Sequence, residues 1–138
     1  MSTSAFYLEI VMSQRPFLIG ADEKNRSMLS FNLTARARAP VDEWEEQLVK
    51  LMVDAGLAAF GTDTFVGRTF ALPEGNGPFV DVTSTGGLPP ELTHDGLTYE
   101  RLSAQVVTRA LDYRVARTRA LAIWRALGGR YNQSLSSM

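Results

Sequence analysis

Residues 99–129, YERLSAQVVTRALDYRVARTRALAIWRALGG, decide the fold, because a strand pattern passes directly into a helix pattern within them. Over residues 99–109, the apolar side chains of Leu102, Ala104 and Val106 alternate with polar neighbours. Alternation with a period of two is typical of a strand with one face in the core and one in water. The first part of this stretch therefore predicts a half-buried strand.

The second part of the stretch predicts a helix that begins at Tyr113. The residues that share its core face are Tyr113, Ala116, Ala120, Ile123, Trp124 and Leu127. Their spacing of three and four residues is that of an amphipathic helix. Asp112 is suited to cap the N-terminus, and Gly128-Gly129 favours termination.

Upstream, two shorter segments predict a β-hairpin. Residues 64–72 are rich in Phe, Val and Thr, and residues 79–85 alternate in polarity. Between them, residues 73–78 contain Gly, Asn and Pro, which favour a turn and interrupt strand pairing. Residues 86–90, GGLPP, are expected to end the second strand as a loop.

Another helix is expected over residues 42–59. Its core-facing side chains would be those of Trp44, Leu48, Leu51, Met52 and Ala55. Asp42 is placed to cap this helix with Glu45 three residues later, and acidic residues in the first turn suit the positive end of the helix dipole. Gly56 and Gly61 favour its end.

The first forty residues predict strands. Residues 31–38 alternate cleanly between apolar and polar side chains, residues 6–10 do so more weakly, and the polar residues 20–26 could join the two. An N-terminal hairpin is the resulting expectation. The serine-rich end, residues 133–138, predicts a flexible tail.

Together these elements predict an α+β fold, with an antiparallel or mixed sheet, both helices packed on one face and an N-terminal β-hairpin arm. A chain of 138 residues is the size of one domain. Within it we expect a strand-rich arm over residues 1–40, a helix-strand-strand-strand-helix core over residues 41–130 and a flexible tail over residues 131–138.

The composition excludes several classes of function. Acidic and basic residues nearly balance, for a formal net charge of −1, so the chain has no bulk attraction for nucleic acid or other polyanions. The absence of cysteine excludes disulfide frameworks and thiolate metal sites, and it fits folding in a reducing cytoplasm. Neither a signal peptide nor a membrane-spanning run is expected, which predicts a soluble protein with no membrane partner.

No pattern in the sequence predicts catalysis, a cofactor or a metal. His94 is the single histidine, and without cysteine a metal there would need carboxylates as its other ligands. Glu43, Glu45 and Glu46 belong to a helix first turn, where the dipole favours acids without any acid–base role. The glycines of residues 75–77 lack the spacing and the following lysine of a phosphate-binding loop.

A candidate subunit interface lies on the last helix, on the face opposite its core stripe. Its residues are Arg114, Val115, Ala122, Arg125 and Ala126. These side chains could contact a neighbouring subunit, or the alanines could be exposed simply because alanine is the best helix former. Arginines could also gather into a surface for an acidic partner or DNA phosphates, with a solvated face as the alternative. The arginines concerned are Arg36, Arg38, Arg101, Arg109, Arg114, Arg117, Arg119 and Arg125.

Residues 42–129 resemble a known protein family in several short motifs and in the order of the predicted elements. The segments that carry the likeness are Phe65-Val66-Gly67-Arg68, Thr85-Gly86-Gly87-Leu88-Pro89-Pro90, Gln105-Val106-Val107-Thr108-Arg109 and the helix from Tyr113. They resemble the siphophage tail terminators, or phage minor capsid proteins. The likeness lies in the short motifs and in the order of the elements. It does not identify functional residues in this chain.

The resemblance implies a non-enzymatic structural protein of the virion tail or neck, made in the host cytoplasm. It would form a homo-hexameric ring at the head-proximal end of the tail tube, stop tube polymerisation and provide the head-joining surface. Its partners would be copies of itself, the tail tube protein and a head-completion or neck protein, with no cofactor. DNA crossing the lumen would pass without sequence-specific binding.

Two alternatives to the terminator remain open. One is a head-completion or neck adaptor protein of a phage or phage-like particle, which differs in its position rather than in its kind. The other, from a different class, is a small hydrolase or ligand-binding domain built on His94 and nearby acids.

Overall fold

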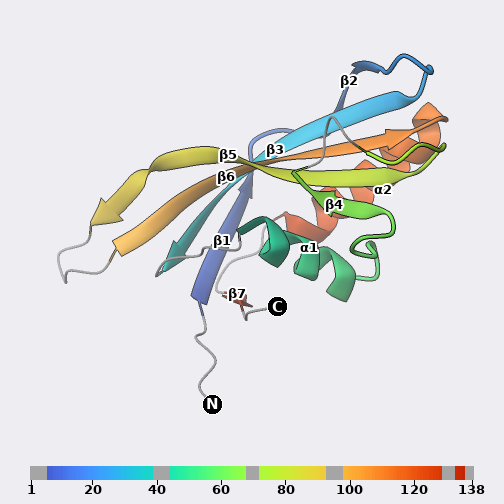
Figure 1. The fold of residues 1–138 in the computed structure, drawn as a ribbon. Helices are drawn as coiled ribbons and strands as arrows, with labels where there is room; N and C mark the ends of the chain where they lie inside the picture. The colour runs from blue at the N-terminus through green and yellow to red at the C-terminus, as the bar shows by residue number, and fades with distance from the viewer. Residues whose placement is uncertain (1–5, 39–43, 68–71, 93–97, 129–132, 136–138) are drawn as a thin grey trace.

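The computed structural model describes residues 6–38, 44–67, 72–92, 98–128 and 133–135. Within these residues, seven strands form one mixed sheet and two helices lie against it (Figure 1). The strands are β1 Phe6–Met12, β2 Phe17–Ala21, β3 Ser27–Arg38, β4 Thr64–Val66, β5 Phe79–Leu92, β6 Thr98–Ala110 and β7 Gln133–Leu135, and the helices are α1 Trp44–Asp54 and α2 Tyr113–Leu127. The predicted α+β class with a mixed sheet is confirmed.

The N-terminal strands are integral to the sheet. The strand order is β4-β5-β6-β3-β1-β7, and β2 pairs with the first part of β3. β3 lies in the centre and pairs with β6 along its whole length, from Ser27↔Ala110 to Arg38↔Tyr99. The antiparallel pairing of residues 6–10 with residues 31–38 occurs as expected, as β1 with β3, whereas β2 was not anticipated.

Both helices pack on one face of the sheet and enclose the core (Figure 1). The fully buried side chains include Phe31 and Leu33 of β3, Leu48 and Met52 of α1, Val80 and Val82 of β5, and Ile123 and Leu127 of α2. Alternate residues of β3 and β5 face this core, as the period of two requires. Each large apolar side chain buried in this way stabilises the fold by roughly 1.5–3 kcal/mol.

Helix α2 begins and ends as the sequence predicts, but its first residue does not face the core. The Asp112 carboxylate accepts a hydrogen bond from the backbone N–H of Arg114 at 2.9 Å, and Gly128 caps the C-terminus. Tyr113, expected on the core face, is 43% exposed. Ala110, Ala116 and Ala120 bring helix and strand together at this end, and such close packing has no space for a tyrosine ring.

Helix α1 is shorter than expected, because it ends at Asp54 instead of Ala59. The chain leaves the helix at Gly56, whose φ of +76° is easy for glycine and costly for other residues. Ala55 is therefore exposed beyond the last turn and does not face the core. The predicted cap at Asp42 lies outside the described residues.

The hairpin expected from residues 64–85 is wrong. β4 pairs parallel to β5, with Thr64 opposite Val80 and Val66 opposite Val82. A parallel pair needs a connection that returns to the start of the neighbouring strand instead of a tight turn. Here the Pro73–Gly75 part of the connection is held by Arg26 and Arg109, which bond to its carbonyl oxygens.

Strand β5 also continues where a loop was expected. It runs through residues 86–90 to Leu92, with irregularities between Ser84 and Gly86 and between Leu88 and Glu91. Gly86 and Gly87 adopt φ of +96° and +119°, and such glycines allow a bulge that bends a strand without ending it. By contrast with the flexible tail expected for residues 131–138, Gln133–Leu135 form β7 on the outer edge of β1.

Candidate subunit interface

The five residues predicted as a subunit interface separate into two groups on α2. Arg114, Val115 and Ala122 line one hollow, whereas Arg125 lines another, beside Ile10, Met12 and Trp124. Ala126 is half-buried and lines neither of them. The structure therefore brings together three of the five residues.

The first hollow, which we call the α2 hollow, has a volume of about 420 Å³. Its lining residues are Leu57, Pro78, Arg114, Val115, Thr118, Arg119 and Ala122. Four of these are apolar, and Val115 is 43% exposed to solvent. Leu57 lies after α1 and Pro78 lies immediately before β5, and the helix pattern alone could not predict that they line this hollow.

Arg119 fixes one wall of the α2 hollow. Its guanidinium donates to the Leu57 carbonyl oxygen at 2.9 Å and lies 3.5 Å from the Asp63 carboxylate. Asp63 in turn accepts hydrogen bonds from the Ala59 backbone N–H and the Thr64 hydroxyl, each at 2.9 Å. The turn between α1 and β4 is therefore held against α2, so that Leu57 has a defined position.

Strand β2 is a second exposed apolar surface, which the sequence analysis missed. Phe17, Leu18 and Ile19 are 45%, 53% and 45% exposed, and all five residues of β2 are exposed. Adjacent residues of a strand point to opposite faces, so β2 presents apolar side chains on both faces. The signal in the sequence was the run Phe-Leu-Ile itself, which does not alternate.

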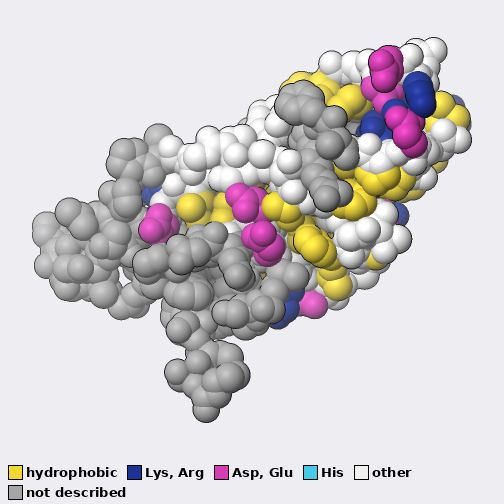
Figure 2. All heavy atoms as spheres, in the orientation of Figure 1, with side chains coloured by type: hydrophobic (Ala, Val, Ile, Leu, Met, Phe, Trp, Pro, Cys, Tyr) yellow, Lys and Arg dark blue, Asp and Glu magenta, His cyan; other side chains and the backbone are white. Residues whose placement is uncertain are grey.

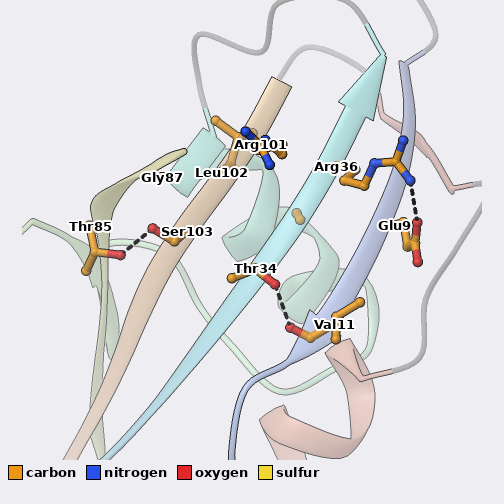
Figure 3. A pocket seen from close by; sticks show the side chains of 10 residues that line it. Glu9, Val11, Thr34, Arg36, Thr85, Gly87, Arg101, Leu102 and Ser103 are labelled. Atoms are coloured by element: carbon orange, nitrogen blue, oxygen red, sulfur yellow. Dashed lines mark hydrogen bonds and ion pairs between the residues drawn. The ribbon is translucent and has the colours of Figure 1, made fainter. Parts of the chain in front are cut away.

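A hollow of about 550 Å³ lies on the open face of the sheet, opposite the helices (Figure 3). Its lining residues come from β1, β3, β5 and β6, and six of the ten are charged or carry a hydroxyl group. Glu9 lies 3.8 Å from Arg36, which is paired across the strands with Arg101. Thr85 donates to Ser103 at 2.7 Å. This hollow combines both signs of charge with hydroxyl groups.

The arginines do not form the single basic surface considered from the sequence. Arg36 and Arg101 are on the open sheet face, whereas Arg114, Arg117, Arg119 and Arg125 belong to the helix on the other face. Arg109 is buried. The side chain of Arg38 lies outside the described residues. Since a sheet separates these groups, they cannot contact one DNA segment together.

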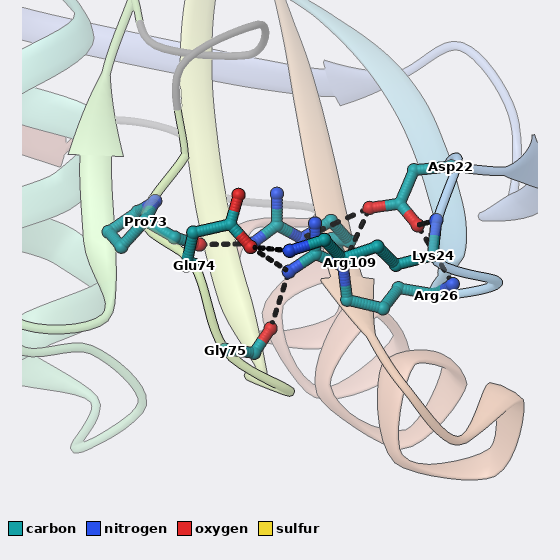
Figure 4. Close-up of polar contacts among 7 residues, drawn as sticks. All are labelled: Asp22, Lys24, Arg26, Pro73, Glu74, Gly75 and Arg109. Carbon is teal, nitrogen blue, oxygen red and sulfur yellow. Dashed lines mark hydrogen bonds and ion pairs between the residues drawn. The ribbon is translucent and has the colours of Figure 1, made fainter.

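Arg109 belongs to a charged cluster at the β2–β3 turn (Figure 4). Arg26 donates from Nε to Asp22 Oδ2 at 2.7 Å and from Nη1 to the Gly75 carbonyl at 2.8 Å, while Arg109 donates to the Pro73 carbonyl. The side chains of Arg26 and Arg109 are only 6% and 8% exposed. We call these contacts the arginine clamp, because they tie the loop before β5 to the β2–β3 turn.

Three ionisable groups in or beside the arginine clamp have shifted pKa values. Partial burial opposes ionisation of Asp22, but hydrogen bonds from Arg26 and from the Lys24 backbone outweigh it and lower the pKa of Asp22. The Lys24 ammonium, 2.6 Å away, lowers the pKa of Glu74. Burial and the neighbouring Arg26 lower the pKa of Arg109, although an arginine keeps its charge in proteins. The carboxylates of Asp22 and Glu74 are therefore ionised at neutral pH.

None of the residues considered for catalysis is brought into a reactive arrangement within the described part of the chain. Glu45 and Glu46 occupy the first turn of α1, as the dipole argument predicts. His94 and Glu43 lie outside the described residues. Among those described, no group of three or more His, Asp or Glu side chains could hold a metal ion, and none of the helices is long and apolar enough to cross a membrane.

Comparisons of the chain with protein-family models, with curated proteins and with solved structures find no match.

Proposed function

We propose that this chain is a ring-forming structural protein of a phage-type tail, the terminator at the head-proximal end of the tail tube. The observation that carries the proposal is a pair of separate exposed apolar surfaces on one molecule. One is β2, beside β3, and the other is the α2 hollow, bounded by Pro78 immediately before β5.

Two different surfaces support a ring instead of a simple dimer. A two-fold dimer uses the same patch on both copies, whereas a closed ring needs two unlike patches that meet head to tail. Exposed apolar patches on a small soluble domain generally mark sites of interaction. The resemblance of residues 42–129 to tail terminators then supports the tail tube as the object that such a ring caps.

The mechanism would be geometric. A ring seated on the end of the tube buries the surface on which the next tube ring would stack, and polymerisation stops. Its outer surface would then be available to a head-completion or neck protein. Each contact between subunits should bury roughly 1,000 Å² or more to be specific.

Native mass spectrometry of the purified chain over a wide concentration range tests the ring. We expect a closed hexamer, formed alone or on tail tubes. Addition of the chain to polymerising tail tube protein should leave tubes that carry a ring at one end and no longer grow. A chain that stays monomeric even with tubes contradicts the proposal, and binding to tailless heads instead of tubes favours the neck adaptor.

A further inference from the structure

Strand β2 has a free edge as well as two apolar faces. It pairs with β3 on one side, and no described strand pairs with its other side. A strand that is apolar on both faces is typical of one covered on both sides, and a free edge is available to another chain. The exposure of Phe17, Leu18 and Ile19 therefore indicates a surface that another chain covers when the protein assembles.

Beside each of the two surfaces lies one charged side chain without a described partner, and the two charges are opposite in sign. α2 contains four arginines and no acidic residue, and the side chain of Arg114 has no ion-pair partner among the described residues. Next to β2, Glu23 is exposed in the β2–β3 turn, also without a partner in the described part of the chain. Figure 2 shows acidic and basic side chains gathered beside hydrophobic ones at the end of the molecule where this turn lies.

The two surfaces are also of similar length. Ala122 and Arg114, which both line the α2 hollow, are about 12 Å apart along the helix at 1.5 Å per residue. Leu18 and Glu23 are five residues apart, a distance of at most about 17 Å in extended chain, and shorter here because Glu23 is in the turn. An apolar contact at Ala122 and an ionic contact at Arg114 can therefore be made together.

We propose that β2 of one copy docks in the α2 hollow of the next copy, with Leu18 against Ala122 and Glu23 near Arg114. This inference rests on the proposed ring, and it names the contact that closes the ring. Because the two surfaces consist of different residues, the contact is heterologous and repeats from copy to copy. The apolar part would supply most of the affinity, and the ionic part the register.

The absence of cysteine in the natural chain allows a direct test by disulfide formation. Leu18→Cys and Ala122→Cys are made separately, mixed in equal amounts and oxidised. We expect disulfide-linked dimers in the mixture and none from either variant alone, because the contact joins unlike surfaces. A chain with both substitutions should give a ladder that stops at the ring size. The matched control is a mixture of Leu18→Cys with Thr34→Cys, an exposed position on the open sheet face.

The outcomes separate this inference from the proposed function, when native mass spectrometry is run on each variant first. A ring that forms without Leu18–Ala122 cross-links overturns the docking contact and leaves the ring in place. Dimers from Leu18→Cys alone overturn it in favour of edge-to-edge pairing of β2. A chain that is monomeric with and without tail tubes overturns both proposals.

A charge exchange provides a second readout. Glu23→Arg and Arg114→Glu should each weaken the contact between neighbouring subunits, raising its dissociation constant by roughly tenfold. Either change places two like charges opposite each other across the interface. The variant with both substitutions should assemble nearly as the natural chain does. Equal weakening in the double variant, without rescue, contradicts the proposed pairing of these two residues.

Discussion

Gly86 and Gly87 in β5 have different surroundings, although both have positive φ. A Cβ atom at Gly87 would overlap the Arg101 carbonyl on β6, whereas a Cβ atom at Gly86 would meet nothing within 4 Å. A side chain at Gly86 would therefore cause backbone strain alone, whereas one at Gly87 would cause both backbone strain and steric overlap. The bulge in β5 depends on both, but only Gly87 allows the two strands to approach.

We expect Gly87→Ala to destabilise the fold more than Gly86→Ala. The substitution at Gly86 should cost about 1–3 kcal/mol from the unfavourable φ, and the substitution at Gly87 should cost more because the strands must also separate. Urea unfolding of both variants measures the difference. Equal losses would mean that β6 does not approach Gly87 as closely as the structure shows.

Asp22 gives the stability a dependence on pH. Its pKa is lower in the folded protein than its usual value of 3.8, so its contribution is fully present above that value and is lost as the pH falls toward the folded-state pKa. We expect Asp22→Asn to unfold at lower urea concentration at pH 7 and to lose less stability than the natural chain between about pH 5 and pH 2. Urea titrations across this range check both statements.

The matched control for Asp22 is its neighbour Glu23, which has no partner among the described residues. Glu23→Gln should keep the pH dependence of the natural chain. An Asp22→Asn variant with the same slope as the natural chain would show that the arginine clamp does not depend on this carboxylate.

At the scale of helices and strands, the sequence predicted those features that depend on residues close together in the chain. Asp112 caps α2 through a bond to a residue two positions away, and the helix therefore begins where the sequence indicates. The connection between the parallel strands β4 and β5 is held instead by Arg26 and Arg109, which are 49 and 36 residues from the carbonyls that they bind. Such distant contacts leave no periodic signal in a single sequence.

The cap of α2 is open to a direct test. Asp112→Ala should lower the free energy of unfolding by about 1 kcal/mol, because the Arg114 N–H loses its acceptor. Asp112→Asn keeps an acceptor oxygen and should remain close to the natural chain. Thermal unfolding compares the two. An alanine variant as stable as the asparagine variant would contradict the assigned cap.

The candidate interface was predictable only in part for a similar reason. Val115 and Ala122 lie on the outer face of a helix, and helical periodicity places them there. Leu57 and Pro78 complete the α2 hollow from segments that the sequence assigned to a helix end and a hairpin turn. β2 was missed because its side chains do not alternate, and exposure on both faces is a property of the folded molecule.

At the scale of the whole molecule, Ala122→Glu tests assembly separately from folding. A carboxylate in the half-buried α2 hollow should prevent ring formation, since a neighbouring apolar strand cannot solvate it. The monomer should keep its melting temperature to within about 3 °C, because the side chain can reach water when no neighbour is bound. Native mass spectrometry and calorimetry measure the two properties.

Ala122→Ser is the matched control, because it adds one hydroxyl group and no charge. It should still assemble. Rings of normal size from Ala122→Glu would remove the α2 hollow from the interface, and a large fall in its melting temperature would show that the loss of rings reflects misfolding.

In the proposed ring, the arginine clamp would limit how far the two contact surfaces of one subunit can move relative to each other. Arg26 follows the turn that carries Glu23, and Gly75, to which it is bonded, precedes the Pro78 wall of the α2 hollow. The buried Arg26 side chain thus connects the β2–β3 turn to the segment that leads to the α2 hollow. These are the two regions that would contact neighbouring subunits. The angle between the two contact surfaces would then be set within each folded subunit. The circumference of a ring would therefore be determined before assembly begins.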